Sequence, residues 1–159
     1  MWVYRKLLRD FPNLRLIIAP RHIERARRVR NLAGRKAAVN VIDRIGVLNE
    51  MYSIADIVFV GGSLIPHGGQ NIIEPAVFAK PVLFGPYMFN FKDEAREFLA
   101  NGAAVMVKDK AQLRNNCKKL LSDAAERVRL GENARTVVLR NQGALEKCLN
   151  ASREILRYA

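Results

Sequence analysis

Apolar residues follow two patterns along this chain: short continuous runs, and stretches in which they recur every three or four residues. Short runs rich in leucine and β-branched residues predict buried strands, at residues 14–19, 37–42, 56–60, 81–84 and 103–107. The helical spacing predicts helices at residues 1–10, 23–32, 47–54 and 92–100. Because strands separated by helices are typical of a parallel sheet covered by helices, we predict an α/β fold.

Glycines mark the ends of two of these helices. Gly34 is placed to cap the helix at 23–32, and Gly102, after Asn101, is placed to end the helix at 92–100. From about residue 111 the pattern is helical almost to the end of the chain. We expect breaks in this helical part near residues 122–123 and at residues 141–143, where small polar residues and a glycine interrupt the pattern.

The length of the chain, 159 residues, fits a single domain with a sizeable core. The chain opens on a helix, whereas a doubly wound domain usually opens on a strand, so we expect the first strand of the sheet to be missing. No apolar run approaches the ~18 residues of a membrane span. Residues 1–10 are helical and charged, which does not fit a signal peptide.

Polar and glycine residues gather in the segments that follow the predicted strands. Because these segments lie at one edge of a parallel sheet, they are expected to converge on a nucleotide-sized crevice. They are residues 20–22, 43–46, 61–71 and 85–90. The stretch from Gly61 to Phe91 contains two of them, and we interpret the rest of the chain as its scaffold.

Two glycine pairs, 61–62 and 68–69, lie in the central loop. Glycines allow backbone N–H groups to approach a phosphate closely. The pattern is neither a P-loop, because no Gly-Lys-Ser/Thr follows, nor a GxGxxG fingerprint. A flexible surface turn is the alternative interpretation of these glycines.

Asn71, Glu74 and Pro75 lie at the start of the helix that follows the central loop. Asn71 and Glu74 have the spacing of a capping box. Pro75 argues against one, because proline cannot donate the first helical hydrogen bond and disfavours the α conformation for the residue before it. We therefore predict that the regular helix begins near Pro75 and that the Glu74 carboxylate is free to accept hydrogen bonds from sugar hydroxyls. A purely capping Glu74 is the alternative.

Arg21 follows the end of the first predicted strand, where a guanidinium suits a phosphate or carboxylate; a solvated surface arginine is the alternative. His22 and His67 are the two histidines, and the His67 side chain could contact a ligand or pack its own loop. The spacing of His, Cys, Asp and Glu residues predicts no zinc site. Cys117 and Cys148 are expected to be free thiols.

The chain is strongly basic, with 27 Lys and Arg residues against 15 Asp and Glu residues and a net charge of +12. This charge favours an anionic partner: nucleic acid, acidic lipid headgroups, or a phosphorylated or carboxylated small molecule. A solubilising surface is the alternative. Seven of the basic residues fall in one short stretch: Arg21, Arg25, Arg27, Arg28, Arg30, Arg35 and Lys36. Nucleic acid is the less favoured partner, because aromatic residues are not interleaved with these basic ones.

A series of short motifs through this chain resembles the Kdo transferases (3-deoxy-D-manno-octulosonic acid transferases) of bacterial lipopolysaccharide synthesis. The motifs lie at residues 19–22, 45–46, 55–56, 59–64, 68–69, 81–82, 85–86 and 89–91, with Leu48, Tyr52, Asn71, Glu74 and Pro75 between them. The resemblance runs from about residue 4 to the end of the fifth predicted strand. It implies the C-terminal, donor-binding half of a two-domain GT-B glycosyltransferase, a Rossmann-like domain spanning residues 1–159. The N-terminal acceptor domain and the first strand would be absent.

The resemblance also implies a reaction and its partners. The donor would be CMP-Kdo, and the acceptor a lipid A precursor at the cytoplasmic face of the bacterial inner membrane, whose anionic surface suits a basic protein. Transfer would be inverting, without metal or cofactor. The catalytic base would be a glutamate of the absent N-terminal domain, so no catalytic residue is expected in this chain, which would be inactive alone.

The resemblance implies eleven site residues in this sequence. Those implied for the CMP moiety are Pro20, Arg21, Ile45, Gly46, Val47, Asn71, Ile72, Ile73 and Glu74. Glu74 would bind the ribose hydroxyls, and Ile45 to Val47 would contribute backbone groups. Gly68 and Gly69 would shape the wall that faces the sugar.

Three departures from the family pattern stand out. Val47 replaces a residue that is often acidic in the family, and Gln70 replaces a histidine found in many members. In the family, the first strand usually brings a small polar loop near the phosphate. We expect this strand to be absent here, which would weaken donor binding and expose a sheet edge or groove. A related GT-B transferase or epimerase with a UDP-sugar is the alternative function, and a basic nucleic-acid-binding module is a further one.

Overall fold

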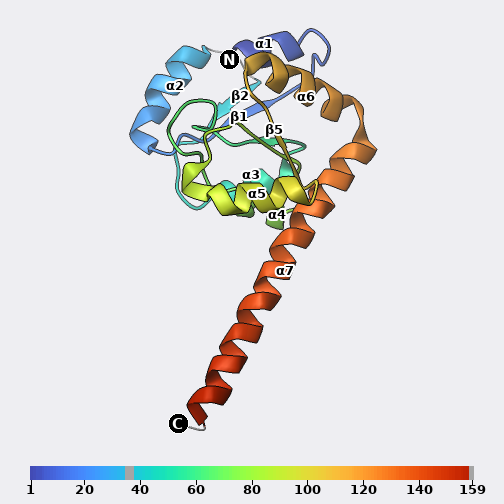
Figure 1. Ribbon diagram of the computed structural model, residues 1–159. Coiled ribbons are helices and arrows are strands. Elements are labelled where there is room, and N and C mark those ends of the chain that lie inside the picture. Colours follow the sequence, from blue (N-terminus) through green and yellow to red (C-terminus); the bar gives the residue numbers. More distant parts are fainter. Residues whose placement is uncertain (35–37, 158–159) are drawn as a thin grey trace.

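The computed structural model describes residues 1–34 and 38–157, with side chains up to residue 142 (Figure 1). Its elements are α1 (Trp2–Leu7), β1 (Leu16–Ile18), the 3-10 turn η1 (Ile23–Arg25), α2 (Ala26–Ala33), β2 (Val39–Val41), α3 (Leu48–Ile54), β3 (Val58–Phe59), α4 (Ile73–Val77), β4 (Val82–Phe84), the 3-10 turn η2 (Phe89–Phe91), α5 (Lys92–Ala100), β5 (Ala104–Met106), α6 (Lys110–Ser122) and α7 (Ala124–Arg157). Every predicted strand is present with narrower bounds. The helix predicted at 23–32 begins as the turn η1.

All strand pairs in the described ranges are parallel, but the strands form two sheets. One sheet has the order β1-β2 and the other has the order β3-β4-β5. In the first, Leu16 pairs with Val39; in the second, Val58 pairs with Val82 and Val82 with Ala104. The predicted α/β fold with parallel strands and flanking helices is therefore confirmed, with its strands divided between two hydrogen-bonded sheets.

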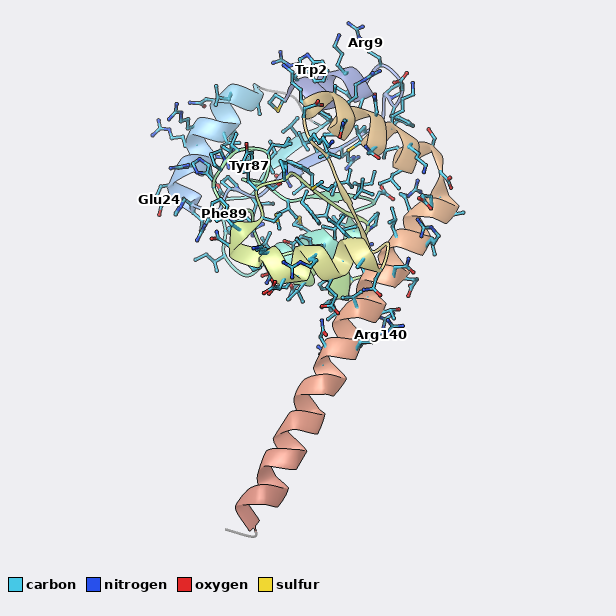
Figure 2. All side chains as sticks on the ribbon, in the orientation of Figure 1. Trp2, Arg9, Glu24, Tyr87, Phe89 and Arg140 are labelled. Atoms are coloured by element: carbon cyan, nitrogen blue, oxygen red, sulfur yellow. The ribbon has the colours of Figure 1, made fainter. Side chains whose placement is uncertain are left out.

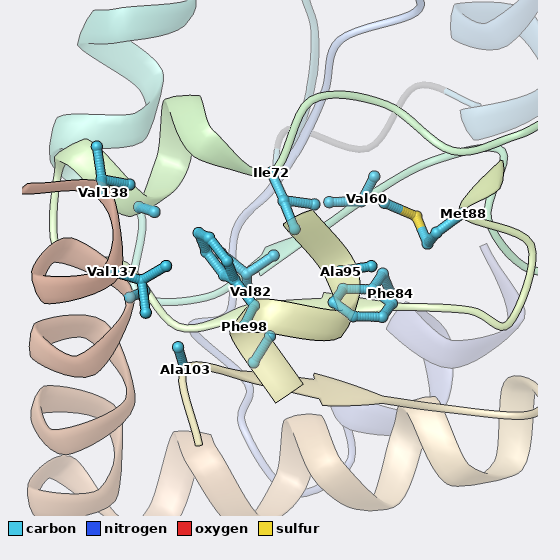
Figure 3. Close-up of a cluster of buried hydrophobic side chains, with 13 residues drawn as sticks. Val60, Ile72, Val82, Phe84, Met88, Ala95, Phe98, Ala103, Val137 and Val138 are labelled. Carbon is cyan, nitrogen blue, oxygen red and sulfur yellow. The ribbon is translucent and has the colours of Figure 1, made fainter. Parts of the chain in front are cut away.

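The core is centred on β4, whose three side chains are almost fully buried. Val82 and Phe84 belong to one apolar cluster, which includes residues of α5 and α7, and Figure 3 shows this cluster. Leu83 belongs to a second cluster, formed with residues of α6 and the α7 residue Leu130. Successive side chains of a strand point to opposite faces, so β4 is covered by helices on both sides. This explains why its sequence is a continuous apolar run.

Helix α1 packs against the beginning of the first sheet and against α6. The Tyr4 hydroxyl donates to the Leu14 carbonyl oxygen at 3.1 Å and to the Ala38 oxygen at 3.4 Å, so it binds the chain where both β1 and β2 begin. Val3, one residue earlier, packs against the second cluster, which contains Leu83 of β4 and residues of α6. An ion pair at 3.0 Å between Lys118 and Asp10 joins the end of this segment to α6.

The C-terminal part is helical, as predicted, and it breaks where expected at residues 122–123. The Asp123 side chain accepts the Glu126 N–H at 2.9 Å and so caps the start of α7. The second expected break, at 141–143, is wrong: α7 runs without interruption to Arg157 and extends away from the rest of the molecule (Figure 1). A helix-interior glycine costs only about 1 kcal/mol and keeps its N–H donor, so Gly143 does not end the helix.

The predicted helix ends and the Cys117 thiol agree with the structure. Gly34 caps α2 with φ of 73°, and Gly102 follows α5 with φ of 57°. Cys117 is a free thiol, and burial raises its pKa to about 11. The side chain of Cys148 lies outside the described residues. Among the helices described, none has the length and apolar character needed to cross a membrane.

Candidate functional site

The loops that follow β3 and β4 are fastened together by one buried serine. Ser63, at 0% exposure, donates from its hydroxyl to the Val60 carbonyl oxygen at 2.6 Å and accepts the Gly85 N–H at 2.7 Å. Its backbone oxygen accepts the Tyr87 N–H at 2.9 Å. Gly85 must be a glycine, because a Cβ there would overlap the Ser63 carbonyl group. The convergence expected for these two loops is therefore confirmed.

Gly68 and Gly69 are buried under the loop that follows β4. Both have positive φ, 85° and 72°, which favours glycine. A Cβ at Gly68 would overlap Asn90, and one at Gly69 would overlap the sulfur of Met88. The Gly68 carbonyl oxygen also accepts the Asn90 N–H at 3.2 Å. These glycines thus let the 61–71 loop lie directly against residues 87–90, where the exposed Tyr87 and Phe89 are labelled in Figure 2.

Helix α4 begins at Ile73, two residues before Pro75, near which we predicted its start. The Asn71 side-chain oxygen accepts the Ile73 N–H at 2.8 Å and stabilises the earlier start. Pro75 then occupies the third helical position, where the N–H of any residue lacks a partner within the helix. A proline there loses no helical hydrogen bond, which removes the objection that predicted the later start.

Neighbouring side chains orient the Glu74 carboxylate, which we predicted to be free to accept hydrogen bonds from sugar hydroxyls. Its Oε1 accepts the Asn71 side-chain N–H at 3.2 Å. Tyr52 of α3 lies beside the same carboxylate; its burial, then the negative charge and hydrogen bonding of Glu74, raises the pKa of Tyr52 to about 12. The Tyr52 ring also contacts Phe78, with centroids 6.3 Å apart. Glu74 is therefore half-buried and oriented, a suitable state for a fixed hydrogen-bond acceptor.

Ile72 and Ile73 lie between these two polar residues and point into the core. Ile72 is 0% exposed and belongs to the main apolar cluster, and Ile73 packs against that cluster. Their side chains anchor the start of α4 and so fix the positions of Asn71 and Glu74 on either side.

The other predicted site residues lie beyond β1 and β2 and are more exposed. Pro20 is half-buried and Arg21 is exposed after β1. Ile45 is 87% exposed, and Gly46 has φ of 85°, directly before the half-buried Val47 that precedes α3. These residues present an arginine side chain and open backbone groups to solvent.

The loop after β2 is tied to α2 by Arg30, from the basic stretch found in the sequence. Its guanidinium donates to the Asp43 carboxylate at 2.7 Å and to the Val41 carbonyl oxygen at 3.4 Å. The hydrogen bond from Arg30 holds the pKa of Asp43 below its usual range. Arg30 thus forms hydrogen bonds within the protein itself. Arg35 and Lys36, from the same basic stretch, lie outside the described residues.

The structure joins two of the four predicted loops by direct hydrogen bonds. Within the described ranges, no hydrogen bond links residues 20–22 or 43–46 to the 61–71 loop. Sequence reasoning missed Ser63 as the joint between loops and Tyr52 as the neighbour of Glu74. A small polar residue just after a buried strand was the signal for Ser63. No signal available in the sequence pairs Tyr52 with Glu74.

Chemically, the start of α4 offers an oriented hydrogen-bond acceptor, and the segment after β1 offers an exposed guanidinium. An oriented carboxylate at Glu74 can accept from hydroxyl groups, and backbone N–H groups and Arg21 can donate to an anion. In the part of the chain that the structure describes, no three His, Cys, Asp or Glu residues gather where they could hold a metal ion.

The family model of the Glycosyl transferases group 1 matches residues 3–137. The chain is similar to the 3-deoxy-D-manno-octulosonic acid transferase of Haemophilus influenzae, with 35% identity over 92% of this chain and 38% of that protein. The enzyme of the same name from Aquifex aeolicus is 33% identical over 84% of this chain and 41% of that protein. The chain thus spans about two fifths of the length of these relatives.

A solved structure is similar as well. The crystal structure of the C-terminal CMP-Kdo binding domain of WaaA from Acinetobacter baumannii matches 86% of this chain and 79% of that domain, with 29% identity and a TM-score of 0.76. The likeness therefore extends over most of both molecules.

Proposed function

Because this chain belongs to the group 1 glycosyl transferases, we propose that it is the donor-binding part of a Kdo transferase. In this proposal, it binds CMP-Kdo, whose Kdo residue is transferred to a lipid A precursor in lipopolysaccharide synthesis. The observation that carries the proposal is the match to a CMP-Kdo binding domain over most of the chain. The names of the relatives, 3-deoxy-D-manno-octulosonic acid transferases, support the transfer of Kdo.

The proposed contacts follow from the chemistry of each group. The Glu74 carboxylate, oriented by Asn71 and Tyr52, accepts hydrogen bonds from the ribose hydroxyls. Arg21 and the backbone around Gly46 bind the phosphate and the base from the side of the first sheet. Gly68 and Gly69 shape the wall that faces the Kdo residue, because they let residues 87–90 lie directly against the 61–71 loop.

The remaining site residues take supporting roles in the proposal. Pro20 directs the chain into Arg21, Ile45 and Val47 contribute backbone groups, and Ile72 and Ile73 contribute theirs from the start of α4. The catalytic base belongs to a separate acceptor-binding domain, and transfer is inverting and uses neither metal nor cofactor. The chain alone therefore binds the donor without transferring the sugar.

The proposal places the complete enzyme at the cytoplasmic face of the inner membrane, where its acceptor lies. The net charge of +12 favours both the anionic donor and an anionic membrane surface. It gives no reason to prefer nucleic acid, for which no recognition motif is present in the sequence.

Calorimetric titration tests the proposal. We expect CMP and CMP-Kdo to bind saturably and UDP to bind much more weakly. Replacement Glu74→Gln keeps the side-chain shape but removes the charge. Since hydrogen bonds to charged groups contribute about 1.5–3 kcal/mol, this change should weaken CMP binding at least about tenfold.

Glu132→Gln is the matched control, because this carboxylate is exposed on α7. It should bind CMP as the unaltered chain does. Absence of saturable CMP binding by folded protein, or equal binding by the Glu74 and Glu132 variants, contradicts the proposal. Stronger binding of UDP than of CMP would favour a UDP-sugar enzyme instead.

A further inference from the structure

Phe89 presents an aromatic ring to solvent between two residues that are anchored in the core. Its side chain is 59% exposed, whereas Met88, directly before it, is 5% exposed and belongs to the main apolar cluster. Phe91, two residues later, packs against the same cluster. Single exposed apolar side chains are common in proteins. The meaning of this one therefore depends on what lies around its ring.

The ring of Phe89 lies against the central loop of the candidate site. A Cβ at Gly68 would overlap its Cε2 atom, so the edge of the ring rests directly on the glycine backbone. The Asn90 N–H donates to the Gly68 oxygen at 3.2 Å, and the Phe91 N–H donates to the Met88 oxygen at 2.9 Å. Backbone hydrogen bonds and core packing thus hold the ring in place although most of it is open to solvent.

Exposed apolar surface extends beyond this ring. Tyr87, from the same loop, is 42% exposed, and Ile65, from the 61–71 loop that lies against it, is 52% exposed. In Figure 2, Tyr87 and Phe89 lie on the side of the molecule away from the projecting end of α7. Aromatic and apolar side chains beside a few oriented polar groups are typical of small-molecule sites. The oriented polar groups here are those at the start of α4.

The length of the intervening chain places Phe89 near those polar groups. Gly68 and Asn71 are three positions apart, so their Cα atoms are separated by at most about 11 Å. In a CMP-sugar, a single phosphate group separates the ribose from the sugar. A ribose bound at Glu74 can therefore place its sugar against Gly68 and the ring of Phe89. This step rests on the proposed function.

We propose that the ring of Phe89 binds the donor sugar by contacting its carbon 3. As its full name states, the proposed donor sugar, 3-deoxy-D-manno-octulosonic acid, has no hydroxyl group at this carbon. Carbon 3 is a methylene, so this side of the sugar is apolar and gains from leaving water. The negative face of an aromatic ring also attracts C–H groups. The hydroxylated sides of the sugar would lose hydrogen bonds to water against the same ring.

Calorimetric titration with CMP-Kdo and with CMP tests the inference, because the two ligands differ only in the sugar. Phe89→Leu keeps an apolar side chain but removes the ring. It should bind CMP-Kdo about fivefold more weakly than the unaltered chain does, and it should bind CMP equally well. Phe89→Tyr keeps the ring and should bind both ligands as the unaltered chain does.

Leu139→Ala is the matched control for loss of an exposed apolar side chain. Leu139 is 55% exposed, close to the value for Phe89, but it belongs to α7. Its replacement should leave the affinities for CMP-Kdo and for CMP unchanged.

NMR spectroscopy of the unaltered chain provides a measurement that needs no variant. With CMP-Kdo bound, the ring protons of Phe89 should show nuclear Overhauser effects to the two protons on carbon 3 of the sugar. Protons of the ribose should show none to this ring, because the ribose is proposed to lie at Glu74.

Three results overturn the inference. They are equal affinity of Phe89→Leu and the unaltered chain for CMP-Kdo, an equal loss of affinity for CMP and CMP-Kdo, and the absence of contact between the Phe89 ring and carbon 3. If Phe89→Leu does not fold, the contact in the unaltered chain decides. If the unaltered chain binds neither ligand, the donor proposal itself fails. If it binds both and Phe89→Leu binds CMP-Kdo equally well, only the role of Phe89 is contradicted.

Discussion

The two halves of the candidate site are built differently. Beyond β3 and β4, the loops are bound to each other through the buried Ser63 and through glycines that lie under neighbouring side chains. Beyond β1 and β2, Arg21, Ile45 and Gly46 are exposed. In the first half, the residues that shape the site also stabilise the core. In the second half, exposed residues can contact a ligand without stabilising the fold. Substitutions in the two halves should therefore have different effects.

The largest expected effect is at Gly85, under the joint between the loops. Gly85→Ala places a Cβ against the Ser63 carbonyl group, where neither backbone can move without disturbing the core. Overpacking of this kind costs about 3 kcal/mol of unfolding free energy, to be measured by urea denaturation. Gly61→Ala is the control, because open space surrounds that position. Equal stabilities of the two variants would mean that the loops are not held closely together.

Removal of the Ser63 hydroxyl should have the next largest effect. Ser63→Ala leaves the buried Gly85 N–H without its acceptor, which costs about 2 kcal/mol of unfolding free energy. The exposed Ser53, which donates to the Glu50 oxygen, serves as the control, and Ser53→Ala should cost less than about 0.5 kcal/mol. If both serine variants unfold at the same urea concentration, the hydrogen bonds of the Ser63 hydroxyl do not hold the two loops together.

A smaller effect should appear in the pH dependence of stability. The pKa of Tyr52 is about 12 in the folded chain against an ordinary value of 10.0, so the unfolded chain loses this proton first as pH rises. The stabilisation linked to protonated Tyr52 is complete below pH 10 and is lost as the pH rises toward about 12. Compared with Tyr52→Phe, the unaltered chain should lose stability more steeply across that interval. Parallel stability curves would contradict the environment described for Tyr52.

The smallest effect on stability should come from Arg21, in the exposed half. Arg21→Gln should change the free energy of unfolding by less than about 0.5 kcal/mol, because its side chain is exposed. In calorimetric titration it should nevertheless weaken CMP binding about tenfold through the loss of a charged phosphate contact. If Arg21→Gln lowers the free energy of unfolding markedly, or if it binds CMP as tightly as the unaltered chain, the two halves do not differ in the way described.

Local patterns predicted most of the fold. The continuous apolar run at β4 and the amphipathic period of α5 depend on neighbouring residues and were found from the sequence. The exact start of α4, two residues before Pro75, was not, because the Asn71 side chain accepts the Ile73 N–H, which has no partner within the helix, and spacing alone does not reveal this bond. The division into two sheets depends on pairing between distant segments, which periodicity does not encode.

The candidate site was predictable to a similar extent. Loops that follow strands indicated its place, and Asn71 and Glu74 were identified as a pair. Their mutual hydrogen bond is local, because only three positions separate the two residues. The contact of Glu74 with Tyr52 is a tertiary feature, because Tyr52 comes from α3. The joint at Ser63 likewise links residues 22 positions apart in the chain.

The central claim is that residues 71–74, at the N-terminus of α4, and the loop before α3 together bind the cytidine nucleotide. Amide chemical-shift mapping by NMR during titration with CMP-Kdo tests it most directly. We predict the largest saturable shifts at residues 71–74 and at Gly46, with small shifts along α6 and α7. Saturable shifts centred on α2 or α6, with residues 71–74 unchanged, would contradict the claim.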